Sequence, residues 1–175
     1  VVEHFYHKDE YVPIWAIFEV ISLAEFGNFV ACANINMKRD IARLLDINVA
    51  YDTDGKMTER SIFLLKDLRN ALAHNDAIFD TRFKRSNVNQ TLSQMLTNET
   101  NIPNITFNTI VDYLILMIYL QKNMKVAKTE LQQIVKKFEV IADKFRKNIP
   151  VSIFNQILYT DTRNKLQFLK NYIKI

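Results

Sequence analysis

Apolar residues recur along this chain at helical rather than alternating spacing, and this period predicts an all-α fold. Only two glycines and three prolines interrupt the pattern. The expected helices, in chain order, are Pro13–Cys32, Met37–Leu45, Thr58–Phe79, Asn87–Leu96, Asn108–Arg146 with a break near Asn123, and Pro150–Ile175 as one helix or a pair. Together they are expected to form a single domain over residues 1–175.

Two polar stretches are predicted to be loops. Tyr51–Gly55 has the composition of a turn, and it lacks the closing glutamate that a calcium-binding loop requires. Thr97–Asn104 contains Pro103 and is predicted to be a long loop inside one domain rather than a linker between two. Thr58 is the expected N-cap of the third helix.

The periodic stretches also predict which residues are buried. One face of the first helix collects large apolar side chains and is expected to pack into the core. Its members are Ile14, Ile17, Phe18, Ile21 and Phe29. Cys32, the sole cysteine, is expected in the core too, and it excludes an intrachain disulfide or a cysteine-based zinc site. A single free thiol suits a reducing compartment, so we expect a cytoplasmic protein.

The most apolar run, Ile110–Leu120, is too short to cross a membrane. It has eleven residues and includes Asp112, whereas a spanning helix needs about 20 apolar residues. It is therefore expected to be a buried helix, and no membrane partner is expected. His4 and His7 are spaced by three but lack further ligands nearby, so we expect no metal and no other cofactor.

Positive charge is concentrated in parts of the chain. The formal net charge is +4, and residues 121–147 hold eight Lys or Arg against three Asp or Glu. A basic helix of this kind is either a solvated face or a contact surface for an RNA backbone, and the sequence leaves both open. A shorter cluster, Arg82, Lys84 and Arg85, follows the third helix at a place suited to a phosphate backbone.

The third expected helix carries Arg69, Asn70 and His74 within six positions. An imidazole can move protons near neutral pH, and a guanidinium can hold a phosphate through paired hydrogen bonds. At about 100° per residue, Asn70 and His74 share a face, while Arg69 and His74 flank the apolar arc about 140° apart. Lys66 and Ala73 lie with Asn70 on the polar face between them, where RNA or the same helix of a second subunit could approach closely.

Two segments resemble a known family. Arg69–His74 resembles the R-x4-H signature of HEPN-domain ribonucleases. Pro13–Ser22 is similar to the P-x-W-x-x-x-E-x-x-S opening of Abi-like abortive-infection proteins, a bacterial phage-defence branch of that superfamily. The resemblance extends over about Tyr11–Phe83. It implies a HEPN-like helical bundle with additional C-terminal helices, and a full protein that begins before Val1.

The resemblance implies a metal-independent endoribonuclease, in which the 2′-hydroxyl of RNA attacks the adjacent phosphorus and leaves a 2′,3′-cyclic phosphate and a 5′-hydroxyl. His74 would act as general acid or base, and Arg69 would stabilise the transition state. Asn70 would orient the imidazole or bind a phosphate oxygen. Glu19 would hold Arg69 across a helix interface, or would simply tie two core helices together.

The same resemblance implies a homodimer whose two Arg-His pairs line one cleft. Lys66, Arg82, Lys84 and Arg85 would then contact the RNA. A cognate regulatory RNA or inhibitor is a further partner that the family allows. The alternatives are a non-catalytic HEPN protein, which binds RNA or a partner toxin or dimerises without cutting, and a purely structural helical interaction module.

Overall fold

The computed structural model describes residues 11, 13–84 and 88–175, and within these ranges it contains helices and no strands. The side chains of Ile14 and Trp15 lie outside this description. The predicted all-α fold is confirmed. The helices are α2 (Ile14–Phe18), α3 (Leu23–Cys32), α4 (Ile35–Leu44), α5 (Met57–Ala73), α6 (Gln90–Thr100), α7 (Ile110–Asn123), α8 (Lys128–Asn148), α9 (Val151–Leu158) and α10 (Thr162–Lys174).

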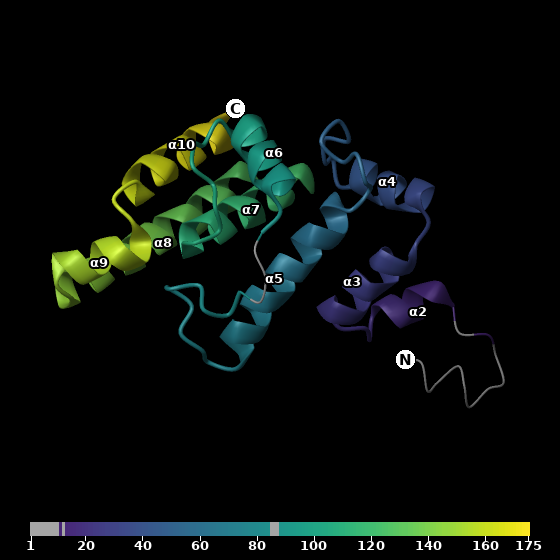
Figure 1. The fold of residues 1–175 in the computed structure, drawn as a ribbon, viewed down its shortest axis with the longest axis horizontal. Helices are drawn as coiled ribbons and strands as arrows, with labels where there is room; N and C mark the ends of the chain where they lie inside the picture. The colour runs from purple at the N-terminus through teal and green to yellow at the C-terminus, as the bar shows by residue number, and fades with distance from the viewer. Residues whose placement is uncertain (1–10, 12, 85–87) are drawn as a thin grey trace.

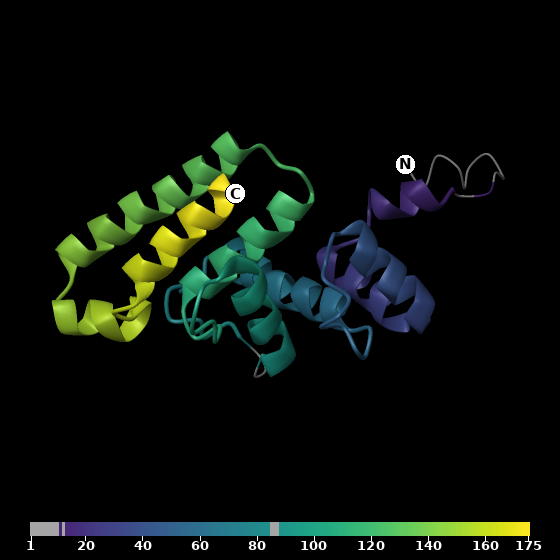
Figure 2. The ribbon, with the colours of Figure 1, turned by 90° about the horizontal axis from the view of Figure 1, so that it is seen from above.

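Helix α5 connects the two ends of the molecule. It packs against α3 and α4 on one side and against α6 and α7 on the other. Helices α8, α9 and α10 lie at the far end from α2, and α8 and α10 run beside each other (Figures 1 and 2). The residues singled out in the third predicted helix are therefore on the element that joins the N-terminal helices to the C-terminal ones.

The core is centred on α7. Its side chains are buried from Ile110 to Leu116, and α5, α6, α8 and α10 all pack against it. The expectation that Ile110–Leu120 is a buried helix is confirmed. The break expected near Asn123 is also present, because α7 ends at this residue and α8 begins at Lys128.

A buried charged pair ties α10 to α7. Lys165 Nζ lies 2.8 Å from Asp112 Oδ1, and the two side chains are 3% and 0% exposed. Lys165 also donates to the carbonyl of Asn104, while the other Asp112 oxygen accepts from the backbone N–H groups of Thr106 and Phe107. The attraction between the two charges and their hydrogen bonds offset much of the cost of removing them from water, so this network can sit in the core. It also fixes the loop that precedes α7.

The expected single helix Pro13–Cys32 is two helices. The break falls at Ser22, whose hydroxyl accepts from the backbone N–H of Glu25, while the Glu25 carboxylate accepts from the backbone N–H of Ser22. This capping box starts a new helix, because it satisfies two donors that an N-terminus would otherwise leave unpaired. The sequence contains this capping-box pattern as Ser22-x-x-Glu25. In the fold, the capping box outweighs the continuous apolar period of residues 13–32.

The apolar face expected to be buried at the N-terminus is largely exposed. Ile17, Phe18 and Phe29 each keep about two fifths of their accessible surface, at 43%, 42% and 42%. Cys32 is exposed as well, so its predicted place in the core is wrong. The helices α2 and α3 pack on one another and on α5, but the described chain supplies no layer to cover their outer face.

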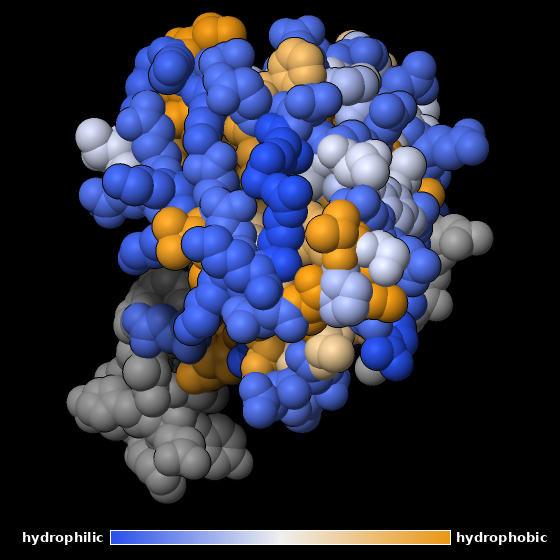
Figure 3. Space-filling model, turned by 90° about the vertical axis from the view of Figure 1, so that its left-hand side faces the viewer, coloured by the Kyte–Doolittle hydropathy of each residue, from blue (hydrophilic) through white to orange (hydrophobic). Residues whose placement is uncertain are grey.

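The opposite end of the molecule has a different surface. Seen from the side where α9 lies, hydrophilic residues predominate and hydrophobic ones form small separate patches (Figure 3). Here α9 and α10 form the pair that the sequence allowed for residues 150–175. In the segment before α7, α6 continues to Thr100 and ends at Asn101, so the predicted loop from Thr97 is shorter than expected.

Candidate functional site

Helix α5 ends earlier than predicted, and its end places His74 at the surface. Asn75 adopts a left-handed conformation with φ 59°, and the backbone N–H groups of Asn75 and Asp76 donate to the carbonyls of Leu72 and Ala71. This pattern is the Schellman motif that terminates helices. The expected continuation to Phe79 is therefore wrong, and His74 is the exposed C-cap residue of the helix.

The start of α5 also differs from the prediction. Thr58 is buried inside the first turn and does not cap the helix. Instead, the carboxylate of Asp52 accepts from the backbone N–H of Met57 at 2.8 Å. The predicted turn Tyr51–Gly55 thus supplies the group that pairs with a free N–H at the helix start. A side chain five residues upstream can do this only because the turn folds back.

Arg69 lies on the last turns of α5 and is exposed. Its Nη1 donates to Asn70 Oδ1 at 3.2 Å, so the predicted supporting residue touches the arginine. The backbone N–H of His74 donates to the carbonyl of Asn70, which places the imidazole one turn further along the same face. Asn70 is thus adjacent to both predicted catalytic residues, whose side chains leave the helix about 140° apart.

Lys66 is less free than the sequence suggested. Its Nζ lies 2.7 Å from Asp67 Oδ1, and the two side chains are only 16% and 12% exposed. The ammonium also lies 5.3 Å from the centre of the Phe63 ring. Neighbouring residues on a helix do not ordinarily face each other, so this pair could not be predicted from spacing. A phosphate would have to displace Asp67 to reach Lys66.

The segment after His74 folds back along α8. Phe79 stacks on Phe145 with ring centres 4.7 Å apart. Thr81, at φ 54°, is buried and donates to the carbonyl of Asn108, and Lys84 Nζ donates to Asn108 Oδ1 at 2.8 Å. These contacts anchor the basic segment to the loop before α7.

Two of the predicted RNA-binding residues in this segment can be placed. Arg82 is exposed and donates from Nε to Asp80, two residues before it in the chain. Lys84 is half-buried, and its Nζ donates to Asn108 Oδ1. Arg85 lies outside the described residues, as do His4 and His7. The described cations of this segment therefore already have polar partners, and both remain reachable from solvent.

Glu19 lies in the turn after α2 and is exposed. No ion pair within 4.0 Å joins it to Arg69 in the described part of the chain. The predicted support of Arg69 by Glu19 stays a prediction.

Tyr113 lies buried beneath this end of α5. Burial raises the pKa of its hydroxyl well above the ordinary value, and the negative charges of Asp67 and Asp112 add to the shift. Its hydroxyl has no hydrogen-bond partner within the described ranges. A phenol in this environment stays neutral near physiological pH.

Two further properties bear on the chemistry. Within residues 11, 13–84 and 88–175, no group of three or more His, Cys, Asp or Glu side chains is arranged to hold a metal ion. In the same ranges, every helix is too short or too polar to pass through a bilayer.

Comparison with known proteins gives a family match over the N-terminal part of the chain. Residues 1–80 match a family described as Abi-like protein, a region that contains α2 to α5 and the Arg69–His74 segment. No curated protein and no solved structure matches the chain.

Proposed function

We propose that this chain, whose residues 1–80 belong to the Abi-like protein family, is a metal-independent endoribonuclease of a phage-defence system. The observation that carries the proposal is the exposure of Arg69 and His74 at the end of a helix inside the family-matched region. A group that must touch RNA has to be accessible, and neither side chain is enclosed in the bundle.

The two side chains have complementary roles in the proposed reaction. An imidazole removes the proton of the 2′-hydroxyl, whose oxygen then attacks the adjacent phosphorus. A second imidazole donates a proton to the departing 5′-oxygen, and a 2′,3′-cyclic phosphate forms. The Arg69 guanidinium donates to the non-bridging phosphate oxygens as charge builds up on them. DNA lacks the attacking hydroxyl and is spared.

A second copy of the chain supplies the second imidazole. One chain carries one histidine at this site, and its arginine leaves α5 about 140° away from it. Symmetric association brings the arginine of one chain towards the histidine of the other. Exposed apolar side chains favour this association: Leu72, which is 57% exposed, lies between Arg69 and His74 in the sequence.

The RNA backbone is proposed to run from this helix end along the basic segment that follows it. Arg82 and Lys84 contribute positive charge there, and exchanging Asp80 or Asn108 for a phosphate oxygen would free them for binding. Such contacts make the affinity for RNA fall steeply as salt is raised.

The experiment is a cleavage assay with purified chain and single-stranded RNA in excess EDTA. We expect cleavage that leaves cyclic phosphate ends, and His74→Ala and Arg69→Ala each lower the rate by about 10²-fold or more. Arg43→Ala removes an exposed arginine on α4 and is expected to cleave like the wild type.

Three results contradict the proposal. They are cleavage that survives His74→Ala, cleavage of the matching DNA, and activity that EDTA abolishes. RNA binding without cleavage by the wild-type chain would instead favour the non-catalytic alternative.

A further inference from the structure

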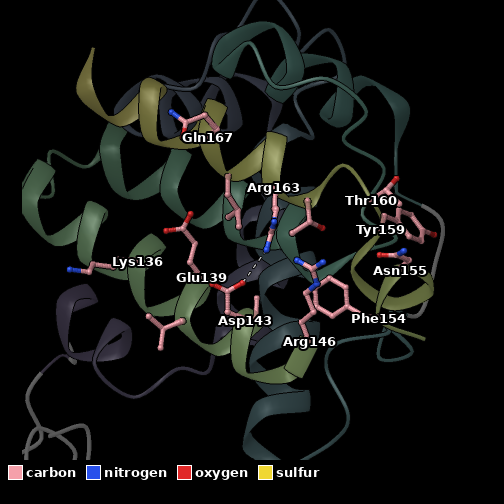
Figure 4. A pocket seen from close by; sticks show the side chains of 14 residues that line it. Lys136, Glu139, Asp143, Arg146, Phe154, Asn155, Tyr159, Thr160, Arg163 and Gln167 are labelled. Carbon is pink, nitrogen blue, oxygen red and sulfur yellow. Dashed lines mark ion pairs between the residues drawn. The ribbon is translucent and has the colours of Figure 1, made fainter. Parts of the chain in front are cut away.

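A cavity lies between α8, α9 and the start of α10, on helices that carry none of the residues assigned above (Figure 4). Its volume is about 670 Å³, within the range of pockets that hold small organic ligands. Side chains from Lys136 to Arg146 on α8, from the middle of α9, from the connection between α9 and α10 and from the first turns of α10 line it. It lies beyond the residues that match the Abi-like family.

Two arginine side chains line the cavity, and neither has a tightly bound carboxylate partner in the described part of the chain. Arg146 lines it, is exposed, and has no carboxylate within 4.0 Å in the described part of the chain. Arg163, from the facing helix, is held only loosely, with Nη2 3.6 Å from Asp143 Oδ1 (Figure 4). The other lining carboxylate, Glu139, is paired with Lys170. Two guanidinium groups from two helices are therefore available to one anion.

Part of the lining is aromatic. Phe154 and Tyr159 line the cavity from α9 and from the residue that follows it. Tyr159 has φ 51° and ψ 158°, a conformation that is costly for any residue except glycine. Such strained residues cluster at ligand sites, where the fold holds a side chain in a required position. Flat aromatic side chains suit a planar ring as the neutral part of a ligand.

One lining residue also carries a buried hydroxyl without a partner. Thr162 lines it and is 4% exposed, and its Oγ1 has no hydrogen-bond partner within the described residues. Leaving a buried hydroxyl unpaired costs about 1–3 kcal/mol, so such a group is typically satisfied by a ligand or water. Thr162 is also the first residue of α10, whose N-terminal end carries a partial positive charge.

We infer that this cavity binds a nucleotide, with its phosphate on Arg146 and Arg163 and its base against Phe154 and Tyr159. The Thr162 hydroxyl pairs with a polar group of the same ligand. Charge selects an anion, the aromatic lining selects a flat ring, and the volume fits the two together. The inference does not rest on the proposed ribonuclease activity, because Arg69 and His74 do not line the cavity.

The test is calorimetric titration of the full chain with AMP, GMP, CMP and UMP, and with inorganic phosphate. At least one nucleotide is expected to bind more tightly than phosphate alone, since the ring adds contacts. Arg146→Ala and Arg163→Ala are each expected to weaken that nucleotide about tenfold or more. Lys147→Ala removes the adjacent positive charge, which does not line the cavity, and is expected to change the affinity little.

Thr162→Val separates a binding role from a structural one. Valine has the same shape without the hydroxyl, so the free protein should become more stable to unfolding while the nucleotide binds more weakly. His74→Ala is expected to lose RNA cleavage and to keep nucleotide affinity, which keeps the two proposals distinguishable. The inference is overturned if no nucleotide binds the wild type, or if Arg146→Ala and Lys147→Ala lose affinity equally.

The phosphate can belong to a free nucleotide or to the end of an RNA strand. A 2′-O-methyl tetranucleotide, which lacks the attacking hydroxyl, is used with and without a 5′-phosphate as competitor. Displacement of the bound nucleotide by the phosphorylated strand alone assigns the cavity to strand ends. Absence of displacement by either strand assigns it to free nucleotides.

Discussion

Asn75 shows how one residue positions the candidate site. It adopts the left-handed conformation that lets α5 stop at Ala73, directly before His74. Asparagine and glycine tolerate this conformation better than other residues. The position of the His74 imidazole at the exposed end of α5 thus depends on Asn75, the residue that follows His74.

We therefore expect Asn75→Ala to destabilise the fold by about 1 kcal/mol and Asn75→Gly to leave stability nearly unchanged. Urea unfolding followed by circular dichroism measures both. In the cleavage assay Asn75→Gly should retain activity, because it keeps the helix end in place. Equal loss of stability in the two variants would show that the asparagine side chain, rather than its backbone conformation, is what α5 requires.

At the scale of elements, the capping box at Ser22 separates α2 from α3. The hydrogen bonds that the Glu25 carboxylate forms with Ser22 lower the pKa of Glu25 below its ordinary value of 4.5. The bond to the Ser22 backbone has the larger effect, and the bond to the Ser22 side chain has the smaller one. A lowered carboxyl pKa means that the contribution to stability is present above pH 4.5 and is lost as the pH falls through the folded-state value.

Ser22→Ala is expected to cost about 1 kcal/mol at neutral pH, since the cap hydroxyl is lost. Glu25→Gln can keep the hydrogen bond to the Ser22 N–H without a titrating charge. The stability advantage of the wild type over Glu25→Gln should therefore shrink as the pH is lowered below 4.5. Urea titrations of both proteins at several pH values measure this, and a constant difference would contradict the assigned role of Glu25.

At the scale of the whole molecule, the proposed reaction needs two chains. The exposed side chains Ile17, Phe18 and Phe29 leave an apolar surface on the N-terminal helices. Surfaces of this kind mark association sites on soluble proteins. Within the described residues, His74 is the one histidine, whereas the proposed reaction uses two imidazoles.

A subunit-poisoning experiment tests this composite site. The inactive double variant Arg69→Ala/His74→Ala is mixed with wild-type chain, with RNA in large excess. Random pairing at equal amounts leaves about a quarter of the dimers fully wild type, so cleavage per wild-type chain should fall to about half. Added Arg43→Ala chain should not poison the wild type. Undiminished cleavage per wild-type chain, together with sedimentation as a monomer, would show that one chain suffices.

Local signals account for most of the correctly predicted elements. The helical period identified the all-α fold, the buried helix over Ile110–Leu120 and the break after Asn123, because each depends on the sequence within a few turns. Two of the errors at helix ends also had local signals: Ser22 with Glu25, and Asn75 before an acidic residue. A longer apolar period obscured both.

Other features had no local signal. The exposure of Phe18 and Cys32 depends on whether another layer covers α2 and α3, and an amphipathic pattern does not reveal which partner its apolar face meets. The Lys66–Asp67 pair depends on side-chain packing that forces neighbours together.

The sequence by itself determined the all-α fold, the similarity of residues 1–80 to the Abi-like protein family, and the residue types at the end of α5 that suit RNA cleavage. Tertiary structure decided which of those residues are accessible and which cations are already paired. It also created the cavity between α8 and α10, whose arginines Arg146 and Arg163 are seventeen positions apart and stand on different helices. The spacing of apolar residues shows which face of a single helix is apolar, whereas a cavity depends on how separate helices pack.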